Sequence, residues 1–225
     1  MIHHHPDKHL LLEYTAGNLP KGASLIVSAH IQMCAECRVQ YRTLNTLGGS
    51  ILESCAPQAV NDEVFHQLIG RINQTAAIAP IQEVILESPR TTAPLLTDVP
   101  PIVNKLIEKN PPIKWKSITP ALKMCRLKTG QDQYEVSFHR LSCGGKVAEH
   151  DHRGCELTLV LQGSFSDNDG IYRRGDFLLR EPGDVHRPTV TEDQECLCFS
   201  AVQAPVAITG VSGWLLNRLI PFQPG

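Results

Sequence analysis

The 225-residue sequence lacks several features that would place it in a common class of proteins. It has no excess of charge of one sign, because 21 Lys and Arg oppose 23 Asp and Glu for a formal net charge of −2. Direct binding to nucleic acid is therefore not expected. No stretch approaches the roughly 18 consecutive apolar residues of a membrane span, and the amino terminus has histidines but no apolar signal region. We expect a cytoplasmic protein that does not contact membranes.

Aromatic residues are also scarce, at 5%, but a hydrophobic content of 42% still predicts folded cores. The eight cysteines do not require a disulfide scaffold, because a chain of this size can fold on its core alone. Cys34-x2-Cys37 with a nearby histidine instead indicates metal binding in a reducing compartment.

The amino-terminal third is expected to be helical. Asp7 caps a first helix that stops at Gly17, and Pro20 opens a second. A third helix is expected from residue 35 to residue 47, ended by Gly48-Gly49. A fourth begins at residues 61–62, because its apolar residues recur at amphipathic helix spacing.

The rest of the chain changes character twice. Seven of the sixteen prolines fall between residues 76 and 112, which predicts a tether over residues 81–112 with one helical turn around 102–109. Beyond residue 113, short apolar runs separated by Gly, Asp and Pro turns favour an antiparallel β-sandwich or barrel. We predict an α+β protein of two domains, helical over 1–80 and all-β over 113–225.

A first group of metal-ligand residues lies in the helical part. His30-x3-Cys34-x2-Cys37 places one imidazole and two thiols on neighbouring helical turns. Tetrahedral zinc needs a fourth ligand, and His5 is the member of the His3–His5 group that is nearest to the first helix. The alternatives are that His3–His5 is part of a tag or a frayed terminus, and that the cysteines form a redox pair. A structural Zn²⁺ is favoured because it can contribute on the order of 10 kcal/mol to a bundle too small for a large core.

This spacing, with the upstream histidine and Gly48-Gly49-Ser50, resembles the zinc-binding anti-sigma factor domain. The resemblance implies that the helical module binds a group IV (extracytoplasmic-function) sigma factor and blocks its access to RNA polymerase. It also implies an amino-terminal histidine as fourth ligand, which corresponds best to His5, with His4 and His9 as alternatives.

A second group lies in the β part. His150 and His152 are two residues apart and point to the same side of a strand. Glu156 follows after a bend at Gly154, and His186 comes from a sequence-distant strand after a Pro-Gly turn. Imidazoles with a carboxylate suit a divalent metal that keeps one coordination position open. The alternative is a set of unrelated polar residues at the mouth of a barrel.

The string Gly145-x4-His150-x-His152-x3-Glu156-x6-Gly163 resembles the first cupin motif, and Gly175-x6-Pro182 with His186 resembles the second. Pro182 and Gly183 are adjacent here rather than separated. The resemblance implies a jelly-roll barrel in which three histidines and one glutamate hold Zn²⁺ or another divalent metal.

Residues 152–163 are similar to the cupin of the ChrR-type zinc-binding anti-sigma factors. The resemblance implies that an oxidative signal such as singlet oxygen releases the sigma factor and that the cupin acts as the sensor. The alternatives are a dioxygenase-like cupin metalloenzyme and a plain zinc-dependent scaffold. A cupin enzyme has no need of the helical metal module, so we expect a regulator that is not an enzyme.

Two further predictions concern residues outside these motifs. Cys196 and Cys198 alternate onto one face of an expected strand. They are ordinary core cysteines or, if that face lines the barrel, oxidisable sensors. His139 matches no motif position and is expected to be a surface or packing residue.

Overall fold

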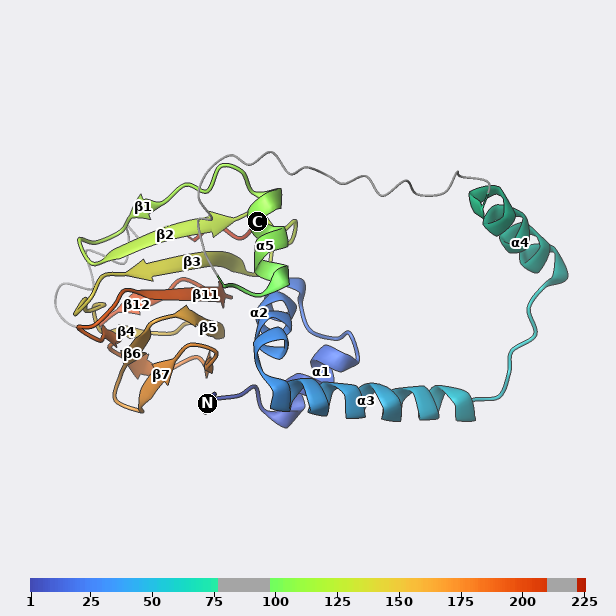
Figure 1. The fold of residues 1–225 in the computed structure, drawn as a ribbon, viewed down its shortest axis with the longest axis horizontal. Helices are drawn as coiled ribbons and strands as arrows, with labels where there is room; N and C mark the ends of the chain where they lie inside the picture. The colour runs from blue at the N-terminus through green and yellow to red at the C-terminus, as the bar shows by residue number, and fades with distance from the viewer. Residues whose placement is uncertain (77–97, 210–221) are drawn as a thin grey trace. The chain divides into compact units, whose positions relative to one another are not determined.

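The computed structural model describes residues 1–76, 98–209 and 222–225. It divides into two compact units, one of residues 1–48 with 98–225 and the other of residues 49–97 (Figure 1). Helices occupy the amino-terminal part and antiparallel strands the carboxy-terminal part, so the α+β prediction is confirmed. Residues 81–97 of the predicted tether lie outside the described residues.

The first two helices begin where the sequence predicts. In α1 (Lys8–Thr15), the Asp7 side chain accepts a hydrogen bond from the Leu10 amide at 2.7 Å, and Gly17 follows with a positive φ of 75°. This bond satisfies one of the amide groups that a helix leaves free at its first turn. Helix α2 (Lys21–Met33) starts after Pro20, whose fixed φ suits a helix start.

The predicted end of the third helix is wrong. Helix α3 (Ala35–Ser54) continues through Gly48-Gly49 for five residues beyond them. Neither glycine has a positive φ, and both are exposed with no neighbouring atoms near the position of a Cβ. A glycine inside an exposed helix costs only about 1 kcal/mol, which is too little to end a long helix by itself.

Helix α4 (Asp62–Ala76) begins as predicted, with Asn61 accepting from the Glu63 amide at 2.8 Å. Helix α5 (Pro101–Lys109) occupies the place of the expected helical turn and packs on α2. The Ile102 amide of α5 donates to the Gln32 side chain of α2 at 3.0 Å.

The β part consists of one large and two small antiparallel sheets. The large sheet has the order β1-β2-β3-β11-β5-β8, and the small sheets have the orders β10-β6-β7 and β12-β4-β9. The strands are β1 (Lys116–Ser117), β2 (Leu122–Leu127), β3 (Glu135–Leu141), β4 (His150–Asp151), β5 (Glu156–Gln162), β6 (Ser164–Ser166), β7 (Ile171–Arg173), β8 (Phe177–Arg180), β9 (Val185–His186), β10 (Thr189–Val190), β11 (Cys196–Val202) and β12 (Ala207–Ile208).

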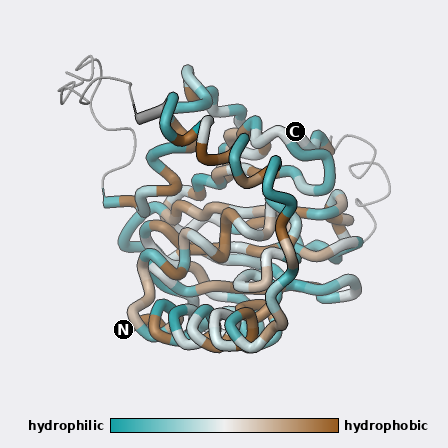
Figure 2. Tube along the Cα trace, turned by 90° about the vertical axis from the view of Figure 1, so that its right-hand side faces the viewer, coloured by the Kyte–Doolittle hydropathy of each residue, from teal (hydrophilic) through white to brown (hydrophobic). Residues whose placement is uncertain are grey.

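The large sheet is covered on both faces. In the register of β5, β11 and β3, Thr158, Ser200 and Ser137 lie side by side on one face of the sheet. Leu159, Phe199 and Phe138 lie side by side on the other face. The first face turns toward the small sheets, where a buried cluster forms from Leu141, Val160, Phe165, Tyr172, Leu178, Val190, Cys196 and Cys198. Figure 2 shows hydrophobic residues concentrated in these strands.

Helix α2 packs against β5 and β11 of the large sheet. Its buried residues include Ala23, Ile26 and Val27, and the close approach at Gly22 leaves no room for a Cβ beside Tyr134. The apolar face of α2 therefore shares a core with the β part. Among the described residues, no helix is long and apolar enough to cross a membrane.

Two candidate metal centres

The first centre forms where the end of α2, the start of α3 and the amino-terminal segment meet. The structure brings together His5, His30, Cys34 and Cys37, whose potential ligand atoms all lie within 4.8 Å of one another. His30 lies in the last turn of α2, while Cys34 is the residue between the two helices and Cys37 lies in the first turn of α3. Of the three histidines considered for the fourth position, His5 is the one in this group.

The separations within the group fit a tetrahedral ion. His5 Nδ1 lies 3.4 Å from the sulfur of Cys34 and 3.4 Å from that of Cys37, and His30 Nε2 lies 3.3 Å from Cys37 Sγ. Around tetrahedral zinc, usual bond lengths place nitrogen and sulfur ligands roughly 3.5 Å apart. The four side chains therefore need little rearrangement to hold such an ion.

Burial sets the protonation of these ligands. It lowers the pKa of His30 to about 4, so the imidazole is neutral at physiological pH. Burial, reinforced by the neighbouring Cys34, raises the pKa of Cys37 to about 12. In the metal-free chain the Cys37 thiol therefore keeps its proton, and a bound cation must displace it.

Both histidines of this centre have a second partner that orients the ring. His30 Nδ1 donates to the backbone oxygen of Gly175 at 2.9 Å, which leaves Nε2 to face the sulfurs. His5 Nε2 lies 3.7 Å from Glu36 Oε2, a contact that becomes an ion pair if the ring is protonated. Such outer contacts fix which ring nitrogen is free for a metal.

The second centre lies at the β4–β9 pair. His150 and His186 are direct partners across these strands, and their Nε2 atoms are 3.1 Å apart. His152 follows β4, and the three side chains form a buried group with ligand atoms within 4.8 Å of one another. Neither ring nitrogen of His152 has a hydrogen-bond partner, although the side chain is fully buried. An orphaned buried imidazole of this kind fits a metal ligand.

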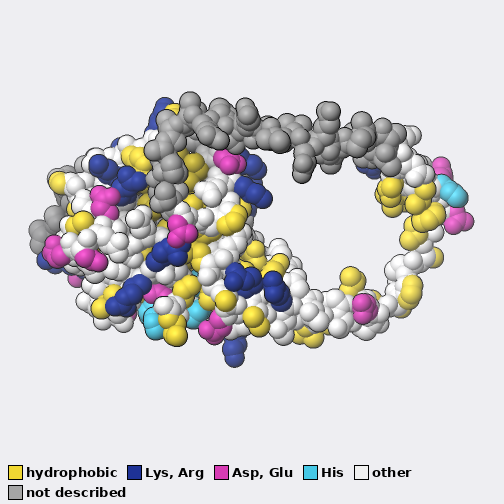
Figure 3. Space-filling model, in the orientation of Figure 1, with side chains coloured by type: hydrophobic (Ala, Val, Ile, Leu, Met, Phe, Trp, Pro, Cys, Tyr) yellow, Lys and Arg dark blue, Asp and Glu magenta, His cyan; other side chains and the backbone are white. Residues whose placement is uncertain are grey.

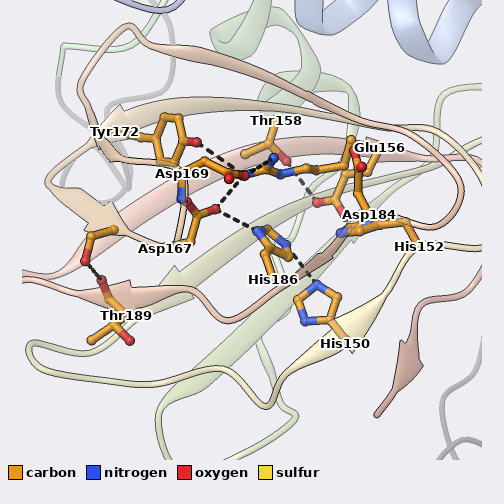
Figure 4. Close-up of polar contacts among 12 residues, drawn as sticks. His150, His152, Glu156, Thr158, Asp167, Asp169, Tyr172, Asp184, His186 and Thr189 are labelled. Atoms are coloured by element: carbon orange, nitrogen blue, oxygen red, sulfur yellow. Dashed lines mark hydrogen bonds and ion pairs between the residues drawn. The ribbon is translucent and has the colours of Figure 1, made fainter.

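The outer partners of this centre are well defined (Figure 4). His150 Nδ1 donates to the Ala148 carbonyl at 2.9 Å, and His186 Nδ1 donates to Asp167 Oδ2 at 2.9 Å. Asp167 is fully buried and also accepts from Arg180 at 2.6 Å. Burial alone would raise the pKa of Asp167, but these hydrogen bonds hold it below its usual range. Both histidines thus present Nε2 inward.

Glu156 is beside the three histidines but less closely bound to them. Its Oε2 lies 3.3 Å from His152 Nδ1, without hydrogen-bond geometry, and its Oε1 accepts from Thr158 at 2.9 Å. Burial opposes ionisation here, yet the neighbouring His152 and other imidazoles hold the pKa of Glu156 below its usual range. The group whose ligand atoms lie within 4.8 Å of one another contains the three histidines and not Glu156, so the place of Glu156 in the ligand set stays a prediction.

The structure also shows the surroundings of His139, Cys196 and Cys198, which lie outside the motifs. His139 lies on β3, where its Nε2 is 3.0 Å from Ser137 Oγ, and burial lowers its pKa. Cys196 and Cys198 belong to the buried core cluster, and their sulfurs are 3.7 Å apart. The packing interpretation of these cysteines is therefore confirmed, and their redox activity stays a prediction.

The sequence did not single out the outer partners Asp167, Arg180 and Asp176. Asp167 lies in one of the Asp and Gly turns between the strands, where its amide donates to the Gly170 carbonyl at 3.0 Å. Nothing in the local pattern indicates that its carboxylate turns inward to a histidine 19 residues away.

These features define a class of protein, in which a helical His and Cys metal module packs on a β-barrel with its own histidine centre. The family model for the ChrR cupin-like domain matches residues 106–205. The anti-sigma-E factor ChrR of Cereibacter sphaeroides is 31% identical over 206 residues, covering 91% of this chain and 92% of that protein. The structure of Rhodobacter sphaeroides SigE in complex with the anti-sigma ChrR matches with a TM-score of 0.72 at 27% identity, covering 90% of this chain and 100% of that chain.

The similarity to ChrR extends over about nine-tenths of this chain and so goes well beyond the part that the cupin-like family model matches. The chain therefore belongs to the ChrR family of anti-sigma factors.

Proposed function

We propose that the protein is an anti-sigma factor that sequesters a group IV (extracytoplasmic-function) sigma factor. The proposal is supported by the similarity to ChrR, which was crystallised in complex with SigE. Within this chain, the observation that carries the proposal is the open apolar face of α4.

Helix α4 has a hydrophobic stripe that no described residue covers. Its large apolar side chains are all exposed, by 38% to 56%, although they share one face of the helix (Figure 3). The stripe consists of Val64, Phe65, Leu68, Ile69 and Ile72. A contiguous apolar face of this kind is typical of a helix that docks in a groove of a protein partner. We propose that the sigma factor covers it.

The two metal centres support different roles. In the first, two thiolates balance the charge of Zn²⁺ and four ligands close the coordination sphere, so we assign a structural zinc to His5, His30, Cys34 and Cys37. In the second, His150, His152 and His186 with Glu156 nearby provide a set for Zn²⁺ or another divalent cation. That ion would hold two separate strands of the barrel together.

We further propose that the cupin part responds to an oxidant such as singlet oxygen and that this response releases the sigma factor. The physical support is that the first metal centre and the barrel belong to the same compact unit. Helix α2, which carries His30 in its last turn, packs on the same sheet whose other face carries Glu156 and Thr158. A change around the barrel histidines therefore has a packed route to the helical module.

The enzyme alternative has no observation in its favour. The histidine centre could bind a metal in a cupin enzyme too, but such an enzyme would leave the His and Cys centre and the apolar face of α4 unexplained. We propose a cytoplasmic regulator with no direct nucleic-acid or membrane partner.

Co-expression with a group IV sigma factor of the same organism tests this function. The expected result is a complex that survives purification and carries metal at the first centre. A folded, metal-loaded chain that elutes without the sigma factor would reject the proposed partner.

A further inference from the structure

The amino-terminal segment is docked on a turn of the barrel. The amides of His3 and His4 donate to Asp176 Oδ1 at 2.7 and 3.1 Å. The His4 carbonyl in turn accepts from the Phe177 amide at 3.0 Å. The segment that ends in the metal-ligand residue His5 is therefore paired with the start of β8, more than 170 residues away in the sequence.

Asp176 is built into the turn that holds the segment. Its side chain is fully buried, and its second oxygen, Oδ2, accepts from the Arg173 amide at 2.8 Å. One carboxylate thus closes the β7–β8 turn and anchors the segment at the same time. Charge-assisted bonds to backbone amides are among the stronger hydrogen bonds in proteins.

The same turn orients the other histidine of the first centre. Gly175, with φ of +92°, directs its carbonyl to His30 Nδ1, and the Phe177 ring lies against the His30 ring with centroids 5.7 Å apart. The Ile2 side chain covers Gly175 so closely that a Cβ there would displace it. Two of the four ligand side chains are therefore positioned by residues 175–177 of the barrel.

The polar contacts matter because the packing beside them is incomplete. A hollow of about 300 Å³ is lined by His3–His5, Tyr172 and residues 177–180, so the segment is not closely packed along the whole of β8. Loss of the Asp176 contacts would free several residues, and each would then have to be ordered again when the metal binds.

We propose that Asp176 is a positioning residue for the first metal centre and that, through it, the barrel sets how tightly this centre retains its metal. The inference rests on the proposed metal binding by His5, His30, Cys34 and Cys37. In this arrangement the helical module supplies all four ligands, and the barrel adds the anchor of the segment that carries one histidine and the hydrogen-bond acceptor of another.

Side-chain contacts also connect the amino-terminal segment to the second metal centre. The His4 ring packs on Tyr172 with centroids 4.7 Å apart, and the Tyr172 hydroxyl accepts from Arg180 at 3.2 Å. Arg180 binds Asp167, the partner of His186. The anchored segment and the barrel histidines thus lie at the two ends of one continuous set of contacts.

The test removes one amide donor and leaves every proposed ligand in place. In the full-length chain, His3→Pro deletes the N–H that donates to Asp176, whereas His3→Ala keeps this N–H and removes only the ring. This pair avoids Asp176→Ala, which would also open the β7–β8 turn. Cobalt is the probe, because its thiolate charge-transfer absorption reports the first centre and not the thiolate-free second centre.

We expect His3→Pro to lose cobalt to a chelator roughly tenfold faster than the wild type, the effect of losing one hydrogen bond to a charged group. The rate at which His3→Ala loses cobalt should remain within about twofold of the wild-type rate. If His3→Pro and the wild type retain cobalt equally, the positioning role is overturned. If the two variants lose cobalt at the same rate, the effect belongs to the His3 ring, and the positioning role is overturned as well. A wild-type chain without thiolate absorption would instead reject the metal centre itself, and the positioning role with it.

Discussion

Cys37 and His30 have opposite protonation needs, and burial favours a different outcome for each. The imidazole is neutral and ready to bind a cation because its pKa is lowered to about 4. The thiol has a pKa raised to about 12, so it becomes a good ligand only when a metal displaces its proton. The empty centre therefore holds a neutral imidazole and a neutral Cys37 thiol, and a metal binds there only as the Cys37 proton is released.

The role of this thiol as a metal ligand gives a prediction for Cys37→Ser. Serine is a poor ligand for zinc, so the variant should lose the metal of the first centre and, with it, the order of residues 1–48 and sigma binding. Structural zinc contributes on the order of 10 kcal/mol in small domains, which exceeds what these helices can replace. Metal content per chain and circular dichroism measure the loss.

Cys55→Ser is the matched control, because Cys55 is exposed and lies outside the cluster. It should keep metal and sigma binding. Full metal content and unchanged binding in Cys37→Ser would show that the ligand assignment is wrong.

The ligand residues could be predicted from sequence, whereas their outer partners could not. Short spacings such as His30-x3-Cys34-x2-Cys37 follow from helix geometry and survive in any tertiary context. The contacts of Asp167 with His186 and of Asp176 with His3 depend on how the strands and the amino-terminal segment come together. Only the folded chain determines these pairs.

At the scale of the element, α3 and α4 show the limits of local signals. The start of α4 was predictable because Asn61 and a regular apolar spacing agree. The end of α3 was not, because Gly48-Gly49 is a common helix stop but adopts ordinary helical geometry here. The four longest strands were predictable from their apolar runs, whereas two-residue strands such as β4 and β9 are defined only by their pairing.

The continuity of α3 can be tested with Gly48→Ala and Gly49→Ala. A Cβ at either position meets no atom within 4 Å, so each substitution should stabilise the helix by about 1 kcal/mol. Hydrogen exchange of the amides from residue 50 to residue 54 should then become slower. Faster exchange would contradict a continuous helix, because alanine would then be replacing a glycine that the backbone requires.

At the scale of the whole molecule, the large sheet joins the two metal centres in one body. Its outer face packs on α2 and its inner face carries the side chains next to the barrel histidines. This arrangement gives the proposed sensor in the barrel a packed connection to the helical module.

We predict that His186→Ala lowers the metal content of the second centre while inhibition of the sigma factor survives. Induction by oxidant should fail or weaken, because the ion no longer joins β4 and β9. A reporter gene under a sigma-dependent promoter, with and without oxidant, measures both effects, and His9→Ala serves as a control at an exposed histidine. Normal induction from a barrel shown to be metal-free would reject the sensor role, and turnover of a small substrate would favour an enzyme.

The central claim is that this chain silences a sigma factor, and the face of α4 provides its sharpest test. Transcription by RNA polymerase with the group IV sigma factor should fall to background as purified chain reaches an equimolar amount. Leu68→Asp, in the apolar stripe, should fail to inhibit, whereas Gln67→Asp, at a neighbouring exposed position away from the stripe, should inhibit fully. If the folded, metal-loaded wild type leaves transcription unchanged, or if both variants inhibit equally, the account is contradicted.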